Sequence, residues 1–168
     1  MVVSTSTPGM LDTDQVEVRT LNLDDLDWVV RIDAERSARP RRAYYELKLR
    51  EAHANTGIRI SLAARLGGVP AGFLMGRLYY GEFGMPEPTA LLDSIGVARA
   101  FSGKHVGAAL MRQLLMNLKA LGVEKLHTQV EWNQWDLLRF FERSGFEPAK
   151  RVCLELAVAA AALPGDLA

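Results

Sequence analysis

The stretch from Ala90 to Leu121 constrains the fold most, because it has the pattern of a strand, a loop and a helix. Leu91 to Val97 is a short apolar run, typical of a buried strand. Apolar residues then recur at three- and four-residue steps and predict an amphipathic helix with one buried face: Val106, Leu110, Met111, Leu114, Leu115, Leu118 and Leu121. Gly122 suits the left-handed turn that ends a helix.

The loop between this strand and this helix, Ser102 to Gly107, has features of an anion site. Gly103 and Gly107 let backbone approach a ligand closely, and the first turn of a helix leaves N–H groups unpaired. With Lys104 beside them, these groups favour phosphate. Taken alone, the loop is explained equally well as a tight turn that needs glycine for its geometry. The phosphate-loop and dinucleotide-binding glycine patterns are both missing, so neither a nucleoside triphosphatase nor a Rossmann dehydrogenase is supported.

Composition narrows the class of protein further. A chain of 168 residues is long enough for one domain with a sizeable core. Its net charge of +0 gives no reason to expect nucleic acid or a membrane as partner. The single cysteine, Cys153, excludes an internal disulfide and is expected in the core. No apolar run approaches the ~20 residues of a membrane helix and no secretory signal is seen, so a cytoplasmic protein is expected.

Periodicity divides the chain into a leader over residues 1–14, a single domain over 15–158 and a tail over 159–168. The predicted strands are 15–21, 58–66, 71–80, 91–97, 125–132 and 151–158. The predicted helices are one that begins after Asn22 or Asp24 and reaches Ala34, and those at 42–54, 106–121 and 135–143. Gly67 to Pro70 predicts a β-hairpin turn. This order indicates a mixed α/β or α+β sheet with helices on both faces.

The order of elements resembles that of the GNAT superfamily of acyl-CoA-dependent N-acyltransferases. Residues 95–111, I-G-V-A-R-A-F-S-G-K-H-V-G-A-A-L-M, look like the family's acyl-CoA segment between the fourth strand and third helix. Residues 130–146, V-E-W-N-Q-W-D-L-L-R-F-F-E-R-S-G-F, look like its segment after the fifth strand. The resemblance implies a mostly antiparallel, twisted sheet of about six strands that splays between strands four and five.

The resemblance also implies a function, the transfer of an acetyl group from acetyl-CoA to a primary amine of a small molecule or protein. The alternative is a GNAT-like acyl-CoA-binding or regulatory domain with little or no catalysis. No metal is expected, because the histidines lack ligand spacing. Partners would be acetyl-CoA and an amine acceptor, without nucleic acid or membrane, and a homodimer is left open. The cofactor-binding residues implied are Ile95, Gly96, Val97, Ser102, Gly103, Lys104, His105, Val106, Gly107, Ala108, Asn133 and Phe141.

Three residues depart from the family pattern. Ser102 stands where the family has a long polar side chain, and His105 replaces the middle glycine of Gln/Arg-x-x-Gly-x-Gly/Ala. A positive φ at His105 would carry strain. Phe141 occupies the place where many members carry a tyrosine that protonates the leaving thiolate, which a phenylalanine cannot do.

Asp93 is the first candidate for the base that deprotonates the amine. It interrupts an apolar strand and is expected to share a face with Leu91 and Ile95, where a carboxylate is costly unless it is partnered or functional. The alternative is that Asp93 accepts hydrogen bonds from a neighbouring loop. Glu82 is the second candidate, and its alternative is a solvated loop charge. Gly96 is expected to form a bulge that frees a backbone N–H for the thioester oxygen.

Two tyrosine pairs are candidates for the acceptor site. By alternation one member of each pair is expected in the core, and the other is free to line an acceptor pocket. Tyr44 and Tyr80 are therefore predicted to bind the amine substrate together with Asp93.

Overall fold

The computed structural model describes residues 15–37, 41–54, 60–80, 84 and 86–160. These residues belong to two compact units, Met1–Trp132 and Asn133–Ala168. Glu82, the leader over 1–14 and the tail beyond Ala160 lie outside the described residues. The single domain over 15–158 stays a prediction. Within the described part of the chain, no helix has the length and apolar composition to cross a membrane.

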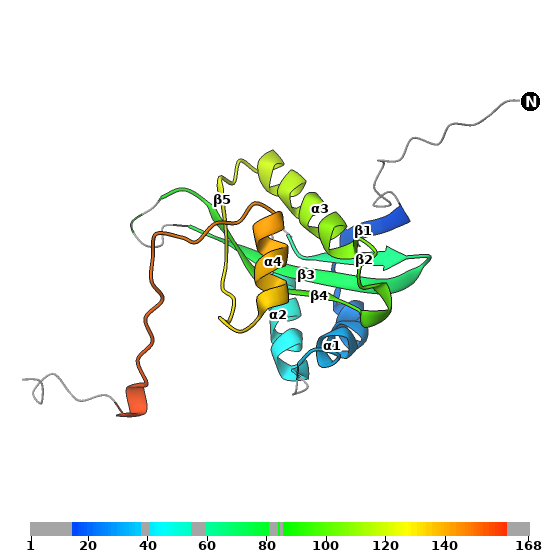
Figure 1. Ribbon diagram of the computed structural model, residues 1–168, viewed down its shortest axis with the longest axis horizontal. Coiled ribbons are helices and arrows are strands. Elements are labelled where there is room, and N and C mark those ends of the chain that lie inside the picture. Colours follow the sequence, from blue (N-terminus) through cyan, green and yellow to red (C-terminus); the bar gives the residue numbers. More distant parts are fainter. Residues whose placement is uncertain (1–14, 38–40, 55–59, 81–83, 85, 161–168) are drawn as a thin grey trace, which may run out of the picture. The chain divides into compact units, whose positions relative to one another are not determined.

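The first unit contains a five-stranded sheet in the order β1-β2-β3-β4-β5 (Figure 1). The strands are β1 (Val16–Thr20), β2 (Leu62–Leu66), β3 (Val69–Tyr79), β4 (Thr89–Val97) and β5 (Lys125–Thr128). The first four pair antiparallel, and β5 pairs parallel with β4. The mixed, mostly antiparallel sheet predicted from the sequence is therefore confirmed.

Helices cover both faces of this sheet, as predicted (Figure 1). After a short 3-10 turn, η2 (Leu23–Asp25), helices α1 (Leu26–Ala34) and α2 (Arg42–Ala54) lie on one face. Helix α3 (Val106–Ala120) lies on the other. The core between the sheet, α1 and α2 consists of Leu21, Trp28, Val29, Ile32, Tyr45, Leu49, Ala63, Phe73, Met75 and Ala98.

A two-residue turn joins β2 to β3. Leu66 pairs with Val69 across Gly67 and Gly68, whose φ values are +58° and +77°. A hairpin of this kind needs left-handed backbone at both central positions, which glycine adopts without steric cost. The predicted hairpin is therefore confirmed, and Figure 1 shows β2 and β3 side by side.

A buried ionic network fixes α1 against the start of α2. The Asp33 carboxylate accepts hydrogen bonds from Arg41 Nε at 3.0 Å and the Tyr45 hydroxyl at 2.8 Å. Burial alone would raise the pKa of Asp33, but these hydrogen bonds and the charge of Arg41 outweigh burial and lower the pKa. The network holds the helix that carries Tyr44 in place beside the sheet.

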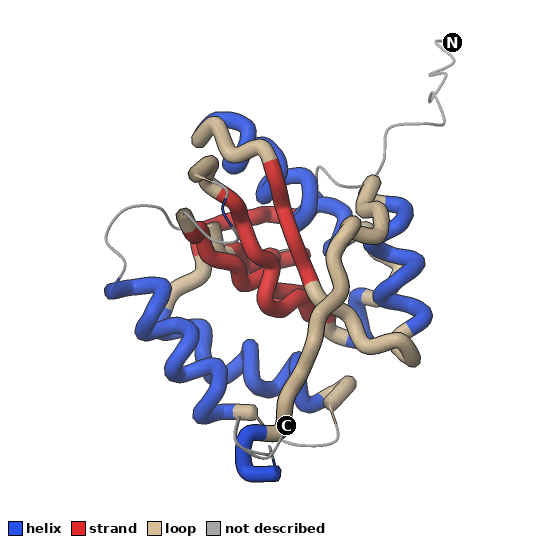
Figure 2. Tube along the Cα trace, turned by 90° about the vertical axis from the view of Figure 1, so that its left-hand side faces the viewer, coloured by secondary structure: helices blue, strands red, loops and turns tan. Residues whose placement is uncertain are grey.

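The second unit contains α4 (Trp135–Arg143) and an extended segment after it. The predicted strand over 151–158 is wrong, because Arg151–Ala157 has no strand structure and η5 (Val158–Ala160) follows (Figure 2). Alternating apolar residues need a neighbouring strand, and no strand of the described residues pairs with this segment. The sheet thus has five strands instead of about six, and Cys153 is exposed instead of buried.

Candidate functional site

Strand β4 contains an irregularity at Asp93. Met75 of β3 faces Ser94, whereas the next residue, Gly76, faces Leu92, so Asp93 is an extra residue in the ladder. An extra residue of this kind is a β-bulge, which bends its strand and redirects its side chains. The bulge predicted at Gly96 is wrong in position, since β4 is already bulged three residues earlier.

Gly96 has a different role, which is to allow close packing. It pairs regularly with Phe73, and a Cβ atom at position 96 would lie 2.6 Å from a carbon of the Phe73 ring. Ile32 of α1 would lie 3.3 Å away. Glycine is thus needed where α1 and the aromatic core meet β4.

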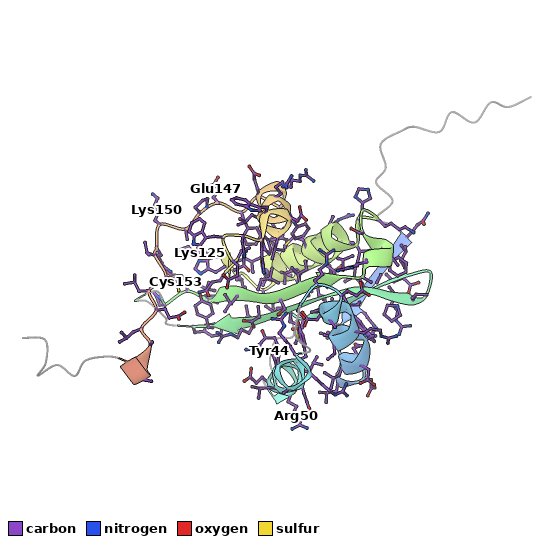
Figure 3. All side chains as sticks on the ribbon, turned by 60° about the horizontal axis from the view of Figure 1, so that its bottom comes forward. Tyr44, Arg50, Lys125, Glu147, Lys150 and Cys153 are labelled. Carbon is purple, nitrogen blue, oxygen red and sulfur yellow. The ribbon has the colours of Figure 1, made fainter. Side chains whose placement is uncertain are left out.

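The bulge directs two consecutive polar side chains toward α2. An Asp93 carboxylate oxygen lies 3.9 Å from Lys48 Nζ of α2 and 3.8 Å from Arg77 Nε of β3. The Ser94 hydroxyl lies 3.4 Å from that of Tyr44. Figure 3 shows Tyr44 on the side of α2 toward the sheet, whereas Arg50 points away. We call these five residues, Tyr44, Lys48, Arg77, Asp93 and Ser94, the bulge cluster.

The environment of Asp93 corrects one expectation. Asp93 does not share a face with Ile95, which pairs with Leu74. Leu74 lies on the face of Gly72, whose Cβ position approaches Val106 of α3. Asp93 instead turns to the opposite face, because the bulge interrupts the alternation. Among the described residues, its charged partners come from a helix and a strand.

The β4–β5 pair separates beyond Leu92. Pairing covers Thr89–Leu92 and Lys125–Thr128, and the Thr128 hydroxyl donates to the Leu92 carbonyl at 3.0 Å. Strand β4 continues to Val97, whereas β5 ends at Thr128 instead of at the predicted 132. The splay predicted between the fourth and fifth strands is therefore confirmed.

Backbone amides of β4 are open where the strands separate. The Ala98 amide donates to the Ala71 carbonyl at 2.9 Å, which fixes its direction toward β3. Successive N–H groups alternate in direction along a strand, so those of Ile95 and Val97 point away from β3. They face the side where β5 no longer pairs with β4.

The loop after β4 has a defined backbone conformation. After a 3-10 turn, η4 (Arg99–Phe101), the Lys104 amide donates to the Phe101 carbonyl at 3.2 Å. Ser102 has φ −60° and ψ 138°, and Gly103 has φ +75°, as in a type II turn. His105 follows with φ 57° and ψ 12°. It is the one non-glycine residue with positive φ in the described part of the chain, so the strain considered from the sequence is present.

The N-terminus of α3 is uncapped by side chains. His105 makes no side-chain capping hydrogen bond, and no acidic residue lies in the first turn. The helical ladder begins with the Ala109 amide, which donates to the His105 carbonyl at 2.9 Å. The amides of Val106, Gly107 and Ala108 therefore lack partners within the helix. With the helix dipole, these amides are suited to hold phosphate.

Two predicted residues, Asn133 and Phe141, belong to the second unit. Asn133 is exposed in the turn before α4. Phe141 is buried, with its ring centroid 5.4 Å from that of Phe140 and 4.9 Å from that of Phe146. Their predicted proximity to the cofactor stays a prediction.

The tyrosine pairs divide partly as expected. Tyr45 is fully buried and Tyr44 is half-buried at the bulge cluster. Tyr80 is 61% exposed after the end of β3. The Tyr79 hydroxyl lies 2.9 Å from His127 Nδ1 and is part-buried.

Lys48 and Arg77 were not predicted as site residues. Arg77 interrupts the apolar run of β3 as Asp93 interrupts that of β4. The sequence does show two opposite charges in two neighbouring apolar strands. It does not show the register between these strands, so it cannot indicate that the two charges lie close together. The part of the chain that the structure describes contains no group of three His, Cys, Asp or Glu residues placed to hold a metal ion.

Comparisons with known proteins agree with this arrangement. Residues 20–146 match the model of the Acetyltransferase (GNAT) family. The chain therefore belongs to the GNAT family, whose members are acyl-CoA N-acetyltransferases. No curated protein sequence matches the chain.

Solved structures show the same fold at low sequence identity. A transcriptional regulator from Bacillus halodurans C-125 has a TM-score of 0.71 and 19% identity, covering 84% of this chain and 98% of that one. A ribosomal-protein-alanine N-acetyltransferase from Brucella melitensis biovar Abortus 2308 has a TM-score of 0.68 and 21% identity, and the match covers 84% of this chain and 97% of that one. The aminoglycoside N-acetyltransferase AAC(6')-Iy in complex with CoA has a TM-score of 0.70 and 16% identity, and the match covers 85% of this chain and 95% of that one.

Proposed function

We propose that this protein is an N-acetyltransferase that moves the acetyl group of acetyl-CoA to a primary amine by direct attack. The observation that carries the proposal is the uncapped N-terminus of α3, with the type II turn at Ser102–Gly103 before it. Its free amides and positive dipole suit the diphosphate of CoA. Lys104 adds a cation beside this site.

The open edge of β4 completes the proposed cofactor site. Amides of Ile95 and Val97 that face away from β3 would bind the pantetheine arm and the developing thioester oxyanion. By family resemblance, Asn133 and Phe141 would lie near the same arm. The strained backbone at His105 is compatible with this role, since phosphate binding uses backbone N–H groups and needs no particular side chain there.

Acetyl transfer requires that the acceptor lose a proton. The amine binds as an ammonium ion, gives one proton to Asp93 directly or through water, and attacks the thioester carbonyl carbon. A C–N bond forms and the C–S bond breaks. The amine nitrogen loses its second proton, the thiolate takes up one proton, and the net products are an amide, free CoA and one proton. Glu82 is the second candidate for the base.

The missing hydroxyl at position 141 does not prevent this reaction. The CoA thiolate is a fairly good leaving group, with a thiol pKa near ~8.5. Water or the proton from the amine therefore suffices to protonate it. A dedicated acid would assist the reaction without being essential.

Calorimetry with acetyl-CoA tests the proposed site directly. We expect binding to the parent protein and loss of binding in Gly107→Val, because a branched side chain blocks the approach of phosphate to the α3 amides. Ala120→Val, at the exposed far end of the same helix, is the matched control and should bind normally. Equal affinity in Gly107→Val would show that the site lies elsewhere.

A screen of amines for release of free CoA tests catalysis. Binding of acetyl-CoA without CoA release from any amine would favour the alternative, a GNAT-like binding or regulatory domain. The departures at Ser102, His105 and Phe141 are what favour that alternative. The choice between small-molecule and protein acceptors, the cytoplasmic location and a homodimer remain parts of the proposal.

A further inference from the structure

We propose that the bulge cluster binds the acceptor as a zwitterion, with its ammonium group on Asp93 and a carboxylate on Arg77. The acceptor class would then be a small amine that carries a carboxylate close to the amino group, such as an α-amino acid. This inference rests on the proposed acetyltransferase function and specifies its second substrate.

Arg77 has the properties of an unused anion-binding side chain. It is half-exposed, and among the described residues its guanidinium approaches only Asp93, through Nε at 3.8 Å. That distance exceeds a hydrogen bond, and the two terminal nitrogens have no partner in the described part of the chain. A guanidinium with both terminal nitrogens available can bind a carboxylate in bidentate fashion.

The Asp93 carboxylate is able to accept hydrogen bonds from the ammonium group of the acceptor. Its side chain is 16% exposed, yet its nearest cations lie at 3.8 and 3.9 Å and it makes no hydrogen bond to the described residues. A carboxylate removed this far from solvent is costly unless donors reach it. The ammonium group of an acceptor would supply up to three such donors.

Lys48 cannot replace Arg77 in this role. Its Nζ lies 3.3 Å from Glu51 and 3.9 Å from Asp93, and its side chain is only 21% exposed. When Glu51, which lies beside the bulge cluster, is included, Lys48 and Arg77 are balanced by Asp93 and Glu51, and the charges sum to zero. A neutral patch of alternating charge complements a zwitterion and offers no excess of negative charge to a polycation.

The positions of these charges also fit the reaction. Asp93 and Arg77 lie next to each other across neighbouring strands, so the acceptor's two charges must be close together as well. The bulge follows Leu92, where β5 stops pairing with β4. An amine held by Asp93 therefore lies beside the open stretch of β4 that the thioester would use.

Matched acceptors test this assignment in the full chain. The common L-amino acids and their carboxamides differ only in the carboxylate. We expect the parent protein to favour at least one amino acid over its carboxamide in kcat/KM. Arg77→Gln should reduce that preference by roughly 10–100-fold, the range for a charge-assisted pair worth ~1.5–3 kcal/mol. KM for the amino acid should rise while kcat changes little.

Arg50→Gln is the matched control. Arg50 is exposed on α2, pairs with Glu46 and points away from the sheet (Figure 3). It should leave the preference unchanged. Equal loss for amino acid and carboxamide in Arg77→Gln, or a parent protein that prefers carboxamides or polyamines, would overturn the assignment.

A binding measurement keeps the inference testable if no turnover is found. Calorimetric titration of the same amino acids and carboxamides into CoA-saturated protein measures whether Arg77 binds the acceptor's carboxylate, without any need for catalysis. Amino-acid binding that Arg77→Gln abolishes would support the inference even when catalysis fails. Absence of amino-acid binding to the parent protein would overturn it, whereas failure of acetyl-CoA to bind would instead refute the proposed function.

Discussion

Replacing His105 by glycine should stabilise the protein, which is unusual for a mutation to glycine. His105 has φ 57°, a left-handed conformation that costs a side chain ~1–2 kcal/mol. Glycine removes this cost but gives the unfolded chain more freedom, worth ~0.5–1 kcal/mol. The imidazole is exposed and makes no capping hydrogen bond, so its loss adds little. The expected net gain is ~0.5–1 kcal/mol.

The variant Ser102→Gly separates the backbone strain at His105 from the entropic cost of introducing a glycine. Ser102 is an exposed residue of the same loop with φ −60°, so glycine there brings the entropic penalty without relief of strain. The difference between the two variants should equal the strain itself, ~1–2 kcal/mol, because the unfolded-state term cancels. Urea unfolding measures both free energies, and an unchanged m-value ensures that the comparison concerns stability.

An equal loss of stability in His105→Gly and Ser102→Gly would contradict a strained backbone at position 105. That result would mean that position 105 relaxes to an ordinary conformation at no cost. Calorimetry with acetyl-CoA adds a functional readout. Binding by His105→Gly should equal or exceed that of the parent, since the amides of the α3 N-terminus keep their direction.

Three further outcomes are expected. Gly96→Ala should lose ~1–3 kcal/mol in urea unfolding, because the new Cβ would lie 2.6 Å from the Phe73 ring, and no loss would contradict the packing. Asp33→Asn, which weakens the buried bonds to Tyr45 and Arg41, should lose ~1–3 kcal/mol at pH 7. The lowered pKa of Asp33 gives stability that is complete above its unfolded pKa of ~3.9 and is lost as pH falls through the folded value, so the difference in stability between parent and variant should shrink steadily as pH falls below ~3.9. Phe141→Tyr should keep acetyl-CoA affinity and raise the rate of CoA release, whereas lower stability with an unchanged rate would show that the hydroxyl stays among the buried rings.

Elements set by local chemistry were predictable from the sequence. Gly67 and Gly68 adopt the left-handed conformations that a two-residue hairpin needs. The apolar spacing in residues 106–121 predicted α3, which ends at Ala120, and Gly122 has φ +69°. In each case the residues that decide the conformation lie within a few positions of one another.

Features set by long-range pairing were not predictable in the same way. The alternation in Arg151–Ala157 matches a strand, but a strand exists only beside a partner. The only sequence signal for a left-handed backbone at His105 is the glycine that the family pattern has at that place. The sequence does not place Arg77 beside Asp93, because their proximity depends on the register between β3 and β4.

The bulge at Asp93 shows why the site needed the structure. In a strictly alternating strand, either Asp93 or Ser94 faces α2, and the other faces α3. The extra residue brings both to the same face, where they meet Lys48 and Tyr44. One inserted residue therefore doubles the polar groups on the acceptor side while Ile95 and Val97 keep their amides directed toward the separated edge of β4. The bulge thus supplies the groups proposed to bind the amine, whereas the end of β5 at Thr128 leaves the backbone of β4 open for the thioester.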